Sequence, residues 1–330
     1  MIKNKSTLIL ISVLAICILV LVVLAFLVVK NAILPVLQPN PQWIELPALE
    51  DKPLSDAKQM LDELGISYEI IPTDSIIANR VEKIEYAGKQ EDGKDFLELG
   101  HTVTLFANEI SADKVVYLTF DDGPTMSNTF DILDTLDTYG AKATFFVLGN
   151  RIREYSDRIL ATDARGHIVA CHSYSHDLDR ASSGFVYASV SAMLSEIEKY
   201  ENALKSVLGE ESFSKLPKLM RFPGGSSTNG RISKSEALDY IAAVRSAGYR
   251  VYDWTALTGD AEGKSTANEF IAYLESGLDK AKNSKKPLII LMHDKLTTSE
   301  ALPQILDYLV EGGYYFSTLD TCPEYTFAEN

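Results

Sequence analysis

The chain has 330 residues, of which 46% are hydrophobic, and it carries a formal net charge of −15 at pH 7. This length and apolar content are enough for two domains with a real hydrophobic core. The negative charge argues against nucleic acids and anionic lipid surfaces as partners, because a strongly acidic protein repels polyanions. The three cysteines are too few to form a disulfide framework in a chain of this size.

The first thirty residues predict a cytoplasmic tip and a membrane anchor. Residues 8–29 form an apolar run in which Ser12 is the only polar residue. As a helix this run spans about 33 Å, which is enough to cross a bilayer. No small-x-small cleavage site follows, which favours an uncleaved anchor over a signal peptide. Lys3 and Lys5 precede the run, so the N-terminus is expected in the cytoplasm and the rest of the chain outside.

A spacer and a small α+β domain are predicted next. Residues 31–45 contain three prolines and little charge, which indicates an extended spacer. Within residues 46–109, the segment SDAKQMLDELG places its apolar side chains on one helical stripe and ends at Gly65. Three segments of alternating polarity predict strands, namely ISYEII, RVEKIEYA and HTVTLFA.

The small domain resembles the PASTA domain, a cell-wall-binding module of bacterial surface proteins. The resemblance lies in LPALEDKPLSDAKQMLDELGISYEI, NRVEKI and GHTVTLFAN, and QEDGKDFLEL looks like an insertion in that pattern. It implies a contact with the cell wall. A spacer domain without a ligand is the alternative, because a fold does not determine a function.

Residues 113–330 follow a repeating strand–helix pattern. The predicted strands are VVYLTF, ATFFVL, HIVACH, KLMRFP, YRVYDW, PLIILMH and YYFSTL. Nearly continuous apolar strands that alternate with helices indicate a parallel sheet buried on both faces. Seven such units predict an α/β fold, a distorted and incompletely closed (β/α) barrel with about seven strands instead of the usual eight.

Polar side chains follow four of these strands directly. They are Asp121, Asp122, His172, His176, Arg221 and His293. Catalytic residues of parallel barrels lie where strands end and loops begin, so these side chains are expected at one mouth. The residues DDGP alone are also typical of a turn, but a turn does not explain the histidines.

The spacing of the two histidines predicts a metal site. His172 and His176 are four residues apart, so a helical turn after Cys171 would place both imidazoles on one side. Two histidines and one carboxylate leave a coordination position open, which is the catalytic arrangement for a zinc-like ion. Adjacent side chains of an extended segment point apart, so only one of Asp121 and Asp122 is expected to bind the ion, with the other acting as a base.

The motifs TFDDGP, HSYSH, RFPGG, LTGDA and LMH, in this order, resemble those of the polysaccharide deacetylases, carbohydrate esterase family 4. The resemblance implies metal-dependent removal of acetyl groups from sugars on a distorted (β/α) barrel. It also implies that Asp121 is the catalytic base and that Asp122, His172 and His176 hold one divalent ion. Zinc is the expected ion, and cobalt, nickel and manganese are the alternatives.

The resemblance assigns roles to four further side chains or backbone groups. Arg221 would pair with Asp121 and keep that carboxylate ionised and oriented. His293 would protonate the leaving amine, and Asp260 would hydrogen-bond its imidazole and favour the protonated form. The backbone N–H of Gly224 would stabilise the oxyanion.

The substrate groove departs from the family pattern. Gly224, after Pro223, and Ala261, in LTGDA, stand where the family often has aromatic residues. Trp254 and Tyr174 are the candidates for groove walls in their place, and packing in the core is the alternative role for Trp254.

Together these features predict an extracytoplasmic, membrane-anchored deacetylase of N-acetylated cell-surface glycan, with peptidoglycan N-acetylglucosamine as the first candidate substrate. The alternatives are a deacetylase of N-acetylmuramic acid, exopolysaccharide, chitin or xylan, and a catalytically silent glycan-binding wall protein.

Overall fold

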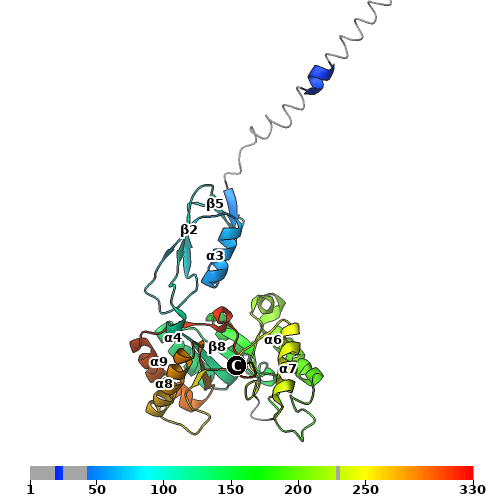
Figure 1. Cartoon of the computed structure of the whole chain (residues 1–330), viewed down its shortest axis with the longest axis vertical. Helices are drawn as coiled ribbons and strands as arrows, with labels where there is room; N and C mark the ends of the chain where they lie inside the picture. The colour runs from blue at the N-terminus through cyan, green and yellow to red at the C-terminus, as the bar shows by residue number, and fades with distance from the viewer. Residues whose placement is uncertain (1–18, 25–42, 228–230, 330) are drawn as a thin grey trace, which may run out of the picture. The chain divides into compact units, whose positions relative to one another are not determined.

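The computed structural model describes three stretches of the chain, residues 19–24, 43–227 and 231–329 (Figure 1). The predicted anchor, residues 8–29, lies outside the described residues apart from a short helical piece at 19–24. Most of the predicted spacer lies outside them as well. Within the described stretches, no helix combines the length and apolar character needed to span a membrane.

The chain forms two compact units, and the smaller includes residues 43–48 and 85–103. Its antiparallel sheet has the order β1-β5-β4, formed by β1 (Trp43–Leu46), β5 (Lys94–Glu98) and β4 (Gly88–Glu91). Asp92 and Gly93 connect β4 to β5 and both have positive φ, 51° and 73°. A two-residue Asp-Gly loop with this backbone is a typical hairpin turn. The segment that looked like an insertion in the sequence is therefore a hairpin.

The larger unit, residues 49–84 and 104–330, begins with the helix predicted around Ala57. This helix is α3 (Leu54–Glu63), and it buries Leu54, Ala57 and Leu61. The three predicted strands form a second small sheet of order β2-β6-β3. Its strands are β2 (Tyr68–Ile71), β6 (Val103–Phe106) and β3 (Lys83–Glu85).

Eight parallel strands form the main sheet, whose order is β11-β10-β9-β8-β7-β13-β12, with β14 also pairing with β7. The strands are β7 (Val115–Gly123), β8 (Thr144–Val147), β9 (Ile168–Cys171), β10 (Leu219–Met220), β11 (Arg250–Val251), β12 (Ala256–Leu257), β13 (Leu288–His293) and β14 (Tyr315–Ser317). All seven predicted strands are present, and β12 is an additional one. The two end strands do not pair with each other, so the barrel is incompletely closed, as predicted.

Six helices accompany the main sheet. They are α4 (Asn128–Tyr139), α5 (Ser156–Ala164), α6 (Val190–Lys215), α7 (Lys234–Ser246), α8 (Ala267–Asn283) and α9 (Leu296–Glu311). Neighbouring helices contact one another in the order α7-α6-α5-α4-α9-α8, which follows the strand order. In Figure 1, α6 and α7 lie on one side of β8, and α8 and α9 lie on the other. Side chains of β7 alternate between two apolar clusters: Val116 and Leu118 belong to one, Val115 and Tyr117 to the other. This period of two places core on both faces of the sheet.

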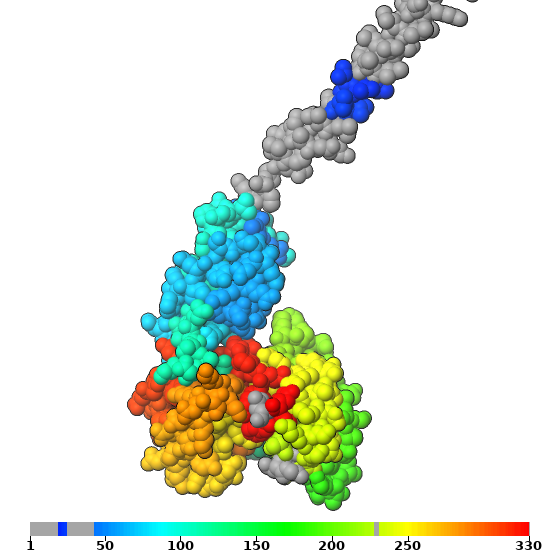
Figure 2. Space-filling model, in the orientation of Figure 1, coloured from blue at the N-terminus to red at the C-terminus, as the bar shows by residue number. Residues whose placement is uncertain are grey.

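The C-terminal segment, residues 322–329, lies at the open side of the barrel. Tyr325 forms a parallel bridge with Tyr252, directly after β11. Glu329 accepts two hydrogen bonds from Arg245 of α7, at 2.6 and 2.8 Å. Figure 2 shows this segment in red at the surface, between α7 and α8.

Candidate active site

The carboxyl ends of the parallel strands bring the predicted polar residues to one edge of the sheet. Asp121 of β7 lies opposite His293 of β13 in the strand register. His172 directly follows β9, and Arg221 directly follows β10, the next strand in the sheet. The structure therefore places the residues of all four strand ends at one mouth, as the sequence predicted.

A β-bulge separates the roles of the two adjacent aspartates. The pairing of β7 with β8 shifts its register between Asp121 and Gly123, which leaves Asp122 as the extra residue. Asp122 has a φ of 69°, in the left-handed region that residues other than glycine rarely adopt. Bulges redirect side chains next to functional sites. Both aspartates approach Nε2 of His172, but only Asp122 also faces His176 and only Asp121 is bound by Arg221.

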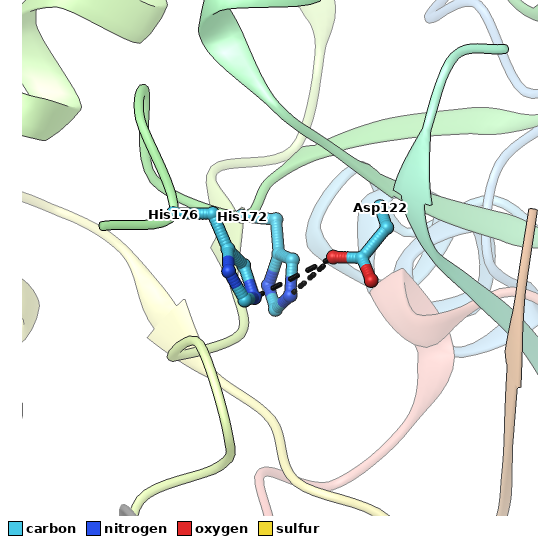
Figure 3. Close-up of side chains that lie close together, drawn as sticks. All are labelled: Asp122, His172 and His176. Atoms are coloured by element: carbon cyan, nitrogen blue, oxygen red, sulfur yellow. Dashed lines mark ion pairs between the residues drawn. The ribbon is translucent and has the colours of Figure 1, made fainter. Parts of the chain in front are cut away.

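Asp122, His172 and His176 form a cluster that fits one metal ion. The Oδ1 atom of Asp122 lies 3.5 Å from the Nε2 atoms of both histidines (Figure 3). Ligand atoms held by one tetrahedral ion at about 2.1 Å are about 3.4 Å apart, so these distances match. Asp122 Oδ1 is buried and has no hydrogen-bond partner among the described residues. Because a buried carboxylate oxygen without a donor is costly, a cation is the partner that suits it.

The backbone and the protonation of this cluster also suit a metal. The turn from His172 to His176 is not helical, contrary to the helical turn considered from the sequence, and His176 has a φ of 55°. The Nδ1 atom of His172 lies 2.9 Å from the carbonyl oxygen of Arg221, which leaves Nε2 for the cluster. Burial, followed by the neighbouring His172, lowers the pKa of His176. A metal ligand must be a neutral imidazole, so this direction favours binding.

Asp122 is ionised in this environment. Burial raises the pKa of Asp122, but the imidazoles of His172 and His176 outweigh that effect and hold it below its ordinary value. The backbone carbonyl of Asp122 accepts a hydrogen bond from Arg151 at 2.7 Å, which fixes the bulge. The cluster therefore offers one ionised carboxylate together with two imidazoles whose Nε2 atoms face it.

Asp121 is held by a buried arginine. Arg221 is fully buried, and its guanidinium donates to Asp121 Oδ1 at 2.8 Å, to Thr119 Oγ1 at 2.8 Å and to two backbone carbonyls. The other oxygen of Asp121, Oδ2, lies 3.7 Å from Nε2 of His172. Arg221 thus occupies one oxygen of Asp121, and the second faces the metal cluster, where a base would accept a proton.

His293 is oriented by Asp260. Its Nδ1 lies 2.9 Å from Asp260 Oδ1, its backbone N–H donates to Oδ2 at 2.7 Å, and Thr298 donates to the same Oδ2 at 2.7 Å. Burial raises the pKa of Asp260, but the hydrogen bond and charge of His293 hold it below its ordinary value. Because Nδ1 is engaged by an ionised carboxylate, Nε2 is the nitrogen that can carry a proton to a substrate.

The loop after β10 presents a free backbone donor. Gly224 and Gly225 both have positive φ, 78° and 76°. The N–H of Gly225 bonds to the carbonyl of Phe222 at 2.7 Å, and Tyr187 donates to the carbonyl of Pro223 at 2.7 Å. The N–H of Gly224 has no hydrogen-bond partner in the described part of the chain. This is the group expected to contact an oxyanion.

A buried aspartate fastens this loop to the C-terminal segment. Asp253, fully buried, accepts hydrogen bonds from the backbone N–H and the hydroxyl of Ser226 and from the N–H of Phe327. Ser226 Oγ in turn accepts from the N–H of Ala328 at 3.0 Å. No sequence pattern indicates this network, because its members lie up to 102 residues apart.

A second buried aspartate, also missed, fastens the loop after β7. Asp294 follows His293 and accepts hydrogen bonds from the hydroxyls of Thr125 and Thr129. Its own N–H donates to the carbonyl of Asp121 at 2.9 Å. Because Asp294 is 3% exposed, its side chain supports the aspartate pair from within the protein and does not face a substrate.

Replacing Gly225 by alanine is expected to destabilise the protein by about 1–3 kcal/mol and to lower its activity. A Cβ atom there would lie 3.0 Å from Asp253 Oδ1 and 3.0 Å from the indole of Trp254, at a positive φ. Urea unfolding of wild type and variant measures the loss of stability. Gly263→Ala is the control, since Gly263 has a φ of 80° but no atom within 4 Å of the added Cβ. Equal losses in both variants would contradict the crowding argument.

The two predicted groove aromatics are partly buried. The ring of Trp254 packs edge-on against that of Phe327, with 4.9 Å between the ring centroids. The guanidinium carbon of Arg221 lies 5.7 Å from the centroid of the Trp254 ring. Tyr174 packs against Gly149, and the ammonium of Lys199 lies 5.9 Å from its ring. A role for Trp254 or Tyr174 in a sugar groove stays a prediction.

Comparisons with known proteins agree with the motifs. The family model for polysaccharide deacetylase matches residues 108–250. A peptidoglycan-N-acetylglucosamine deacetylase of Bacillus cereus is 34% identical over 206 residues, which cover 62% of this chain and 68% of the relative. The catalytic domain of a peptidoglycan N-acetylglucosamine deacetylase from Eubacterium rectale superimposes with a TM-score of 0.55, at 31% identity, over 64% of this chain and 92% of that one. A family 4 carbohydrate esterase of Streptococcus mutans gives a TM-score of 0.53 at 30% identity, over 62% and 86%.

Proposed function

Because the chain belongs to the polysaccharide deacetylase family, we propose that it hydrolyses the acetamido group of N-acetylated cell-surface glycan, specifically the N-acetylglucosamine of peptidoglycan. In this reaction water adds to the carbonyl carbon, the C–N bond breaks, and acetate and a free amine result. The observation that carries the proposal is the cluster of Asp122, His172 and His176 beside the Asp121–Arg221 pair.

We infer that Asp122, His172 and His176 hold one divalent ion, with zinc as the first candidate and cobalt, nickel or manganese as alternatives. When bound, such an ion acts as a Lewis acid that polarises the acetyl carbonyl and acidifies water. The support for the site is the unpartnered Asp122 Oδ1 and the 3.5 Å spacing of the ligand atoms.

The remaining residues account for the proton transfers. Asp121, through its free Oδ2, accepts the proton of the attacking water. The N–H of Gly224 donates to the oxyanion that develops on the acetyl oxygen. His293 donates a proton to the leaving nitrogen, and Asp260 fixes the ring that does so. Arg221 keeps Asp121 oriented but does not contact the substrate.

Purified peptidoglycan treated with residues 31–330 tests the substrate proposal. Mass spectrometry of the released muropeptides is expected to show the loss of one acetyl group from the glucosamine. Loss of the acetyl group from muramic acid would make that sugar the substrate in place of N-acetylglucosamine. Activity confined to chitin, xylan or a secreted polysaccharide would likewise make that glycan the substrate. No deacetylation of any glycan by metal-loaded protein would leave a glycan-binding protein as the function.

Replacing Asp260 by asparagine is expected to move the alkaline limb of the kcat/KM profile to lower pH. Burial lowers the pKa of His293, but the hydrogen bond and charge of Asp260 outweigh it and hold this pKa above its ordinary value. Activity that needs protonated His293 is lost as pH rises through this pKa. Without the carboxylate charge the pKa falls, so the loss begins at lower pH. If the alkaline limb does not move, the ionisation behind it belongs to a group other than His293.

We also propose that residues 8–29 anchor the protein in the cell membrane with a cytoplasmic N-terminus, and that the PASTA-like residues 46–109 keep the exported enzyme near the wall. The support is the apolar run, the lysines before it and the resemblance of the small domain. Fractionation of the full chain and of a variant without residues 1–30 tests the anchor: only the full chain is expected in the membrane fraction. Sedimentation of residues 46–109 with purified wall tests the wall contact.

A further inference from the structure

A buried glutamate outside the recognised motifs holds the turn between the two histidine ligands. Glu196 lies on α6 and is 5% exposed. Its Oε2 accepts three hydrogen bonds from this turn: from the backbone N–H of Tyr174 at 3.1 Å, from the N–H of Ser175 at 2.7 Å and from the hydroxyl of Ser175 at 2.7 Å. One carboxylate oxygen therefore accepts from both backbone N–H groups of two successive residues and from the serine hydroxyl.

The turn needs such support because its backbone is unusual. Ser173 and His176 both have positive φ, 65° and 55°. Each left-handed residue other than glycine costs about 1–3 kcal/mol and persists only where the surroundings impose it. Successive N–H groups that converge in a turn of this kind form a concave anion-binding nest, and Glu196 supplies the anion. Within the described residues, Glu196 is the sole acceptor for the N–H groups of Tyr174 and Ser175.

The position of His176 depends on this turn. His172 is fixed independently, since its N–H bonds to the carbonyl of Val147 and its ring contacts the carbonyl of Arg221. Within the described residues, the N–H of His176 bonds to Ser173 Oγ at 3.0 Å, inside the same turn, and its Nε2 lies 3.5 Å from Asp122 Oδ1. Relaxation of the turn toward ordinary φ values would therefore move the His176 imidazole away from Asp122, and His172 would stay in place.

We propose that Glu196 is a positioning residue of the metal site, which sets the affinity for the ion by holding His176 in place. This inference rests on the proposed metal site formed by Asp122, His172 and His176. Side chains that orient metal ligands typically change affinity by about 10–100-fold when they are removed. Glu196 acts through the backbone of the turn and does not contact the ion or the substrate.

Cobalt(II) binding to the full chain tests the proposal, with dissociation constants from chelator competition and the visible absorption spectrum as readouts. Glu196→Met keeps the length of the side chain but removes its acceptors, and we expect its cobalt affinity to fall about 10–100-fold with an altered spectrum. Glu196→Gln restores one neutral acceptor. Its cobalt affinity should lie between those of Glu196→Met and wild type, because hydrogen bonds to a charged acceptor are about twice as strong. Glu198→Met is the control, since Glu198 is exposed on the same helix.

The outcomes separate this inference from the proposed function. Folded Glu196→Met protein with wild-type affinity and spectrum would overturn the positioning role, even if its thermal stability is lower. If Glu196→Met does not fold, Glu196→Gln decides: unchanged affinity overturns the proposal, and a several-fold loss supports it. Wild-type protein that does not bind cobalt at all would overturn the metal site itself, and the positioning role with it.

Discussion

Replacing Asp121 by asparagine is expected to abolish turnover while the divalent metal content stays at the wild-type level. Asparagine keeps the size of the side chain and an oxygen that accepts from Arg221, which donates to Oδ1 at 2.8 Å. It cannot accept the proton of the attacking water. Since a positioned general base contributes about 10²–10⁴-fold to a rate, kcat/KM should fall by at least about 100-fold. Elemental analysis and acetate release from acetylated glycan measure the two quantities.

The control is Asp131→Asn, which makes the same change at an exposed position of α4 and should leave both quantities unchanged. Retained turnover in Asp121→Asn would remove Asp121 from the role of base. Loss of metal from this variant would instead place Asp121 among the metal ligands. This outcome is tested because Asp121 Oδ2 lies only 3.7 Å from Nε2 of His172.

Replacing Asp122 by asparagine is expected to remove the metal and, with it, all activity. Asp122 is the only carboxylate in the cluster, and its φ of 69° is one that asparagine tolerates, so the bulge should survive the change. Loss of the charged ligand should weaken metal binding by at least about 100-fold, beyond the effect of removing a residue that only orients a ligand. Chelator competition measures the affinity.

The stability of the same variant gives an independent check. Asp122 Oδ1 makes no hydrogen bond within the described residues, so a bound ion is the partner that this oxygen would have in wild type. Wild type should gain thermal stability when metal is added, because a ligand that binds only the folded state stabilises it, and the variant should not. A variant that gains as much as wild type would contradict the ligand assignment.

Much of the fold was predictable because its signals are local. Apolar runs bounded by turn residues identified seven strands of the main sheet and the helix α3. The strand β12 was not predictable, because its two residues, Ala256 and Leu257, are too short to show any period. The hairpin of the small unit was not predicted either, because Asp92-Gly93 lies inside a segment that looked like an insertion.

The site was predictable to the extent that it lies at strand ends. Asp121, Asp122, His172 and His176 follow buried strands, so topology alone brings them together. The residues that hold the loops of the site in place were not predictable. Glu196, Asp253 and Asp294 act through contacts with loops from other parts of the chain. Nor could the sequence show that Ser173 and His176 have left-handed φ values, because only a few per cent of residues other than glycine adopt this backbone.

The bonds between Ser226, Asp253 and residues 327–328 give the C-terminal segment a consequence for catalysis. Asp253 accepts from the N–H of Phe327, and Ser226 Oγ accepts from the N–H of Ala328, so this segment is tied to the loop that carries Gly224. Proteolytic removal of the segment from residue 326 onward would cut these bonds and release the loop of the oxyanion donor, although no catalytic side chain would be lost.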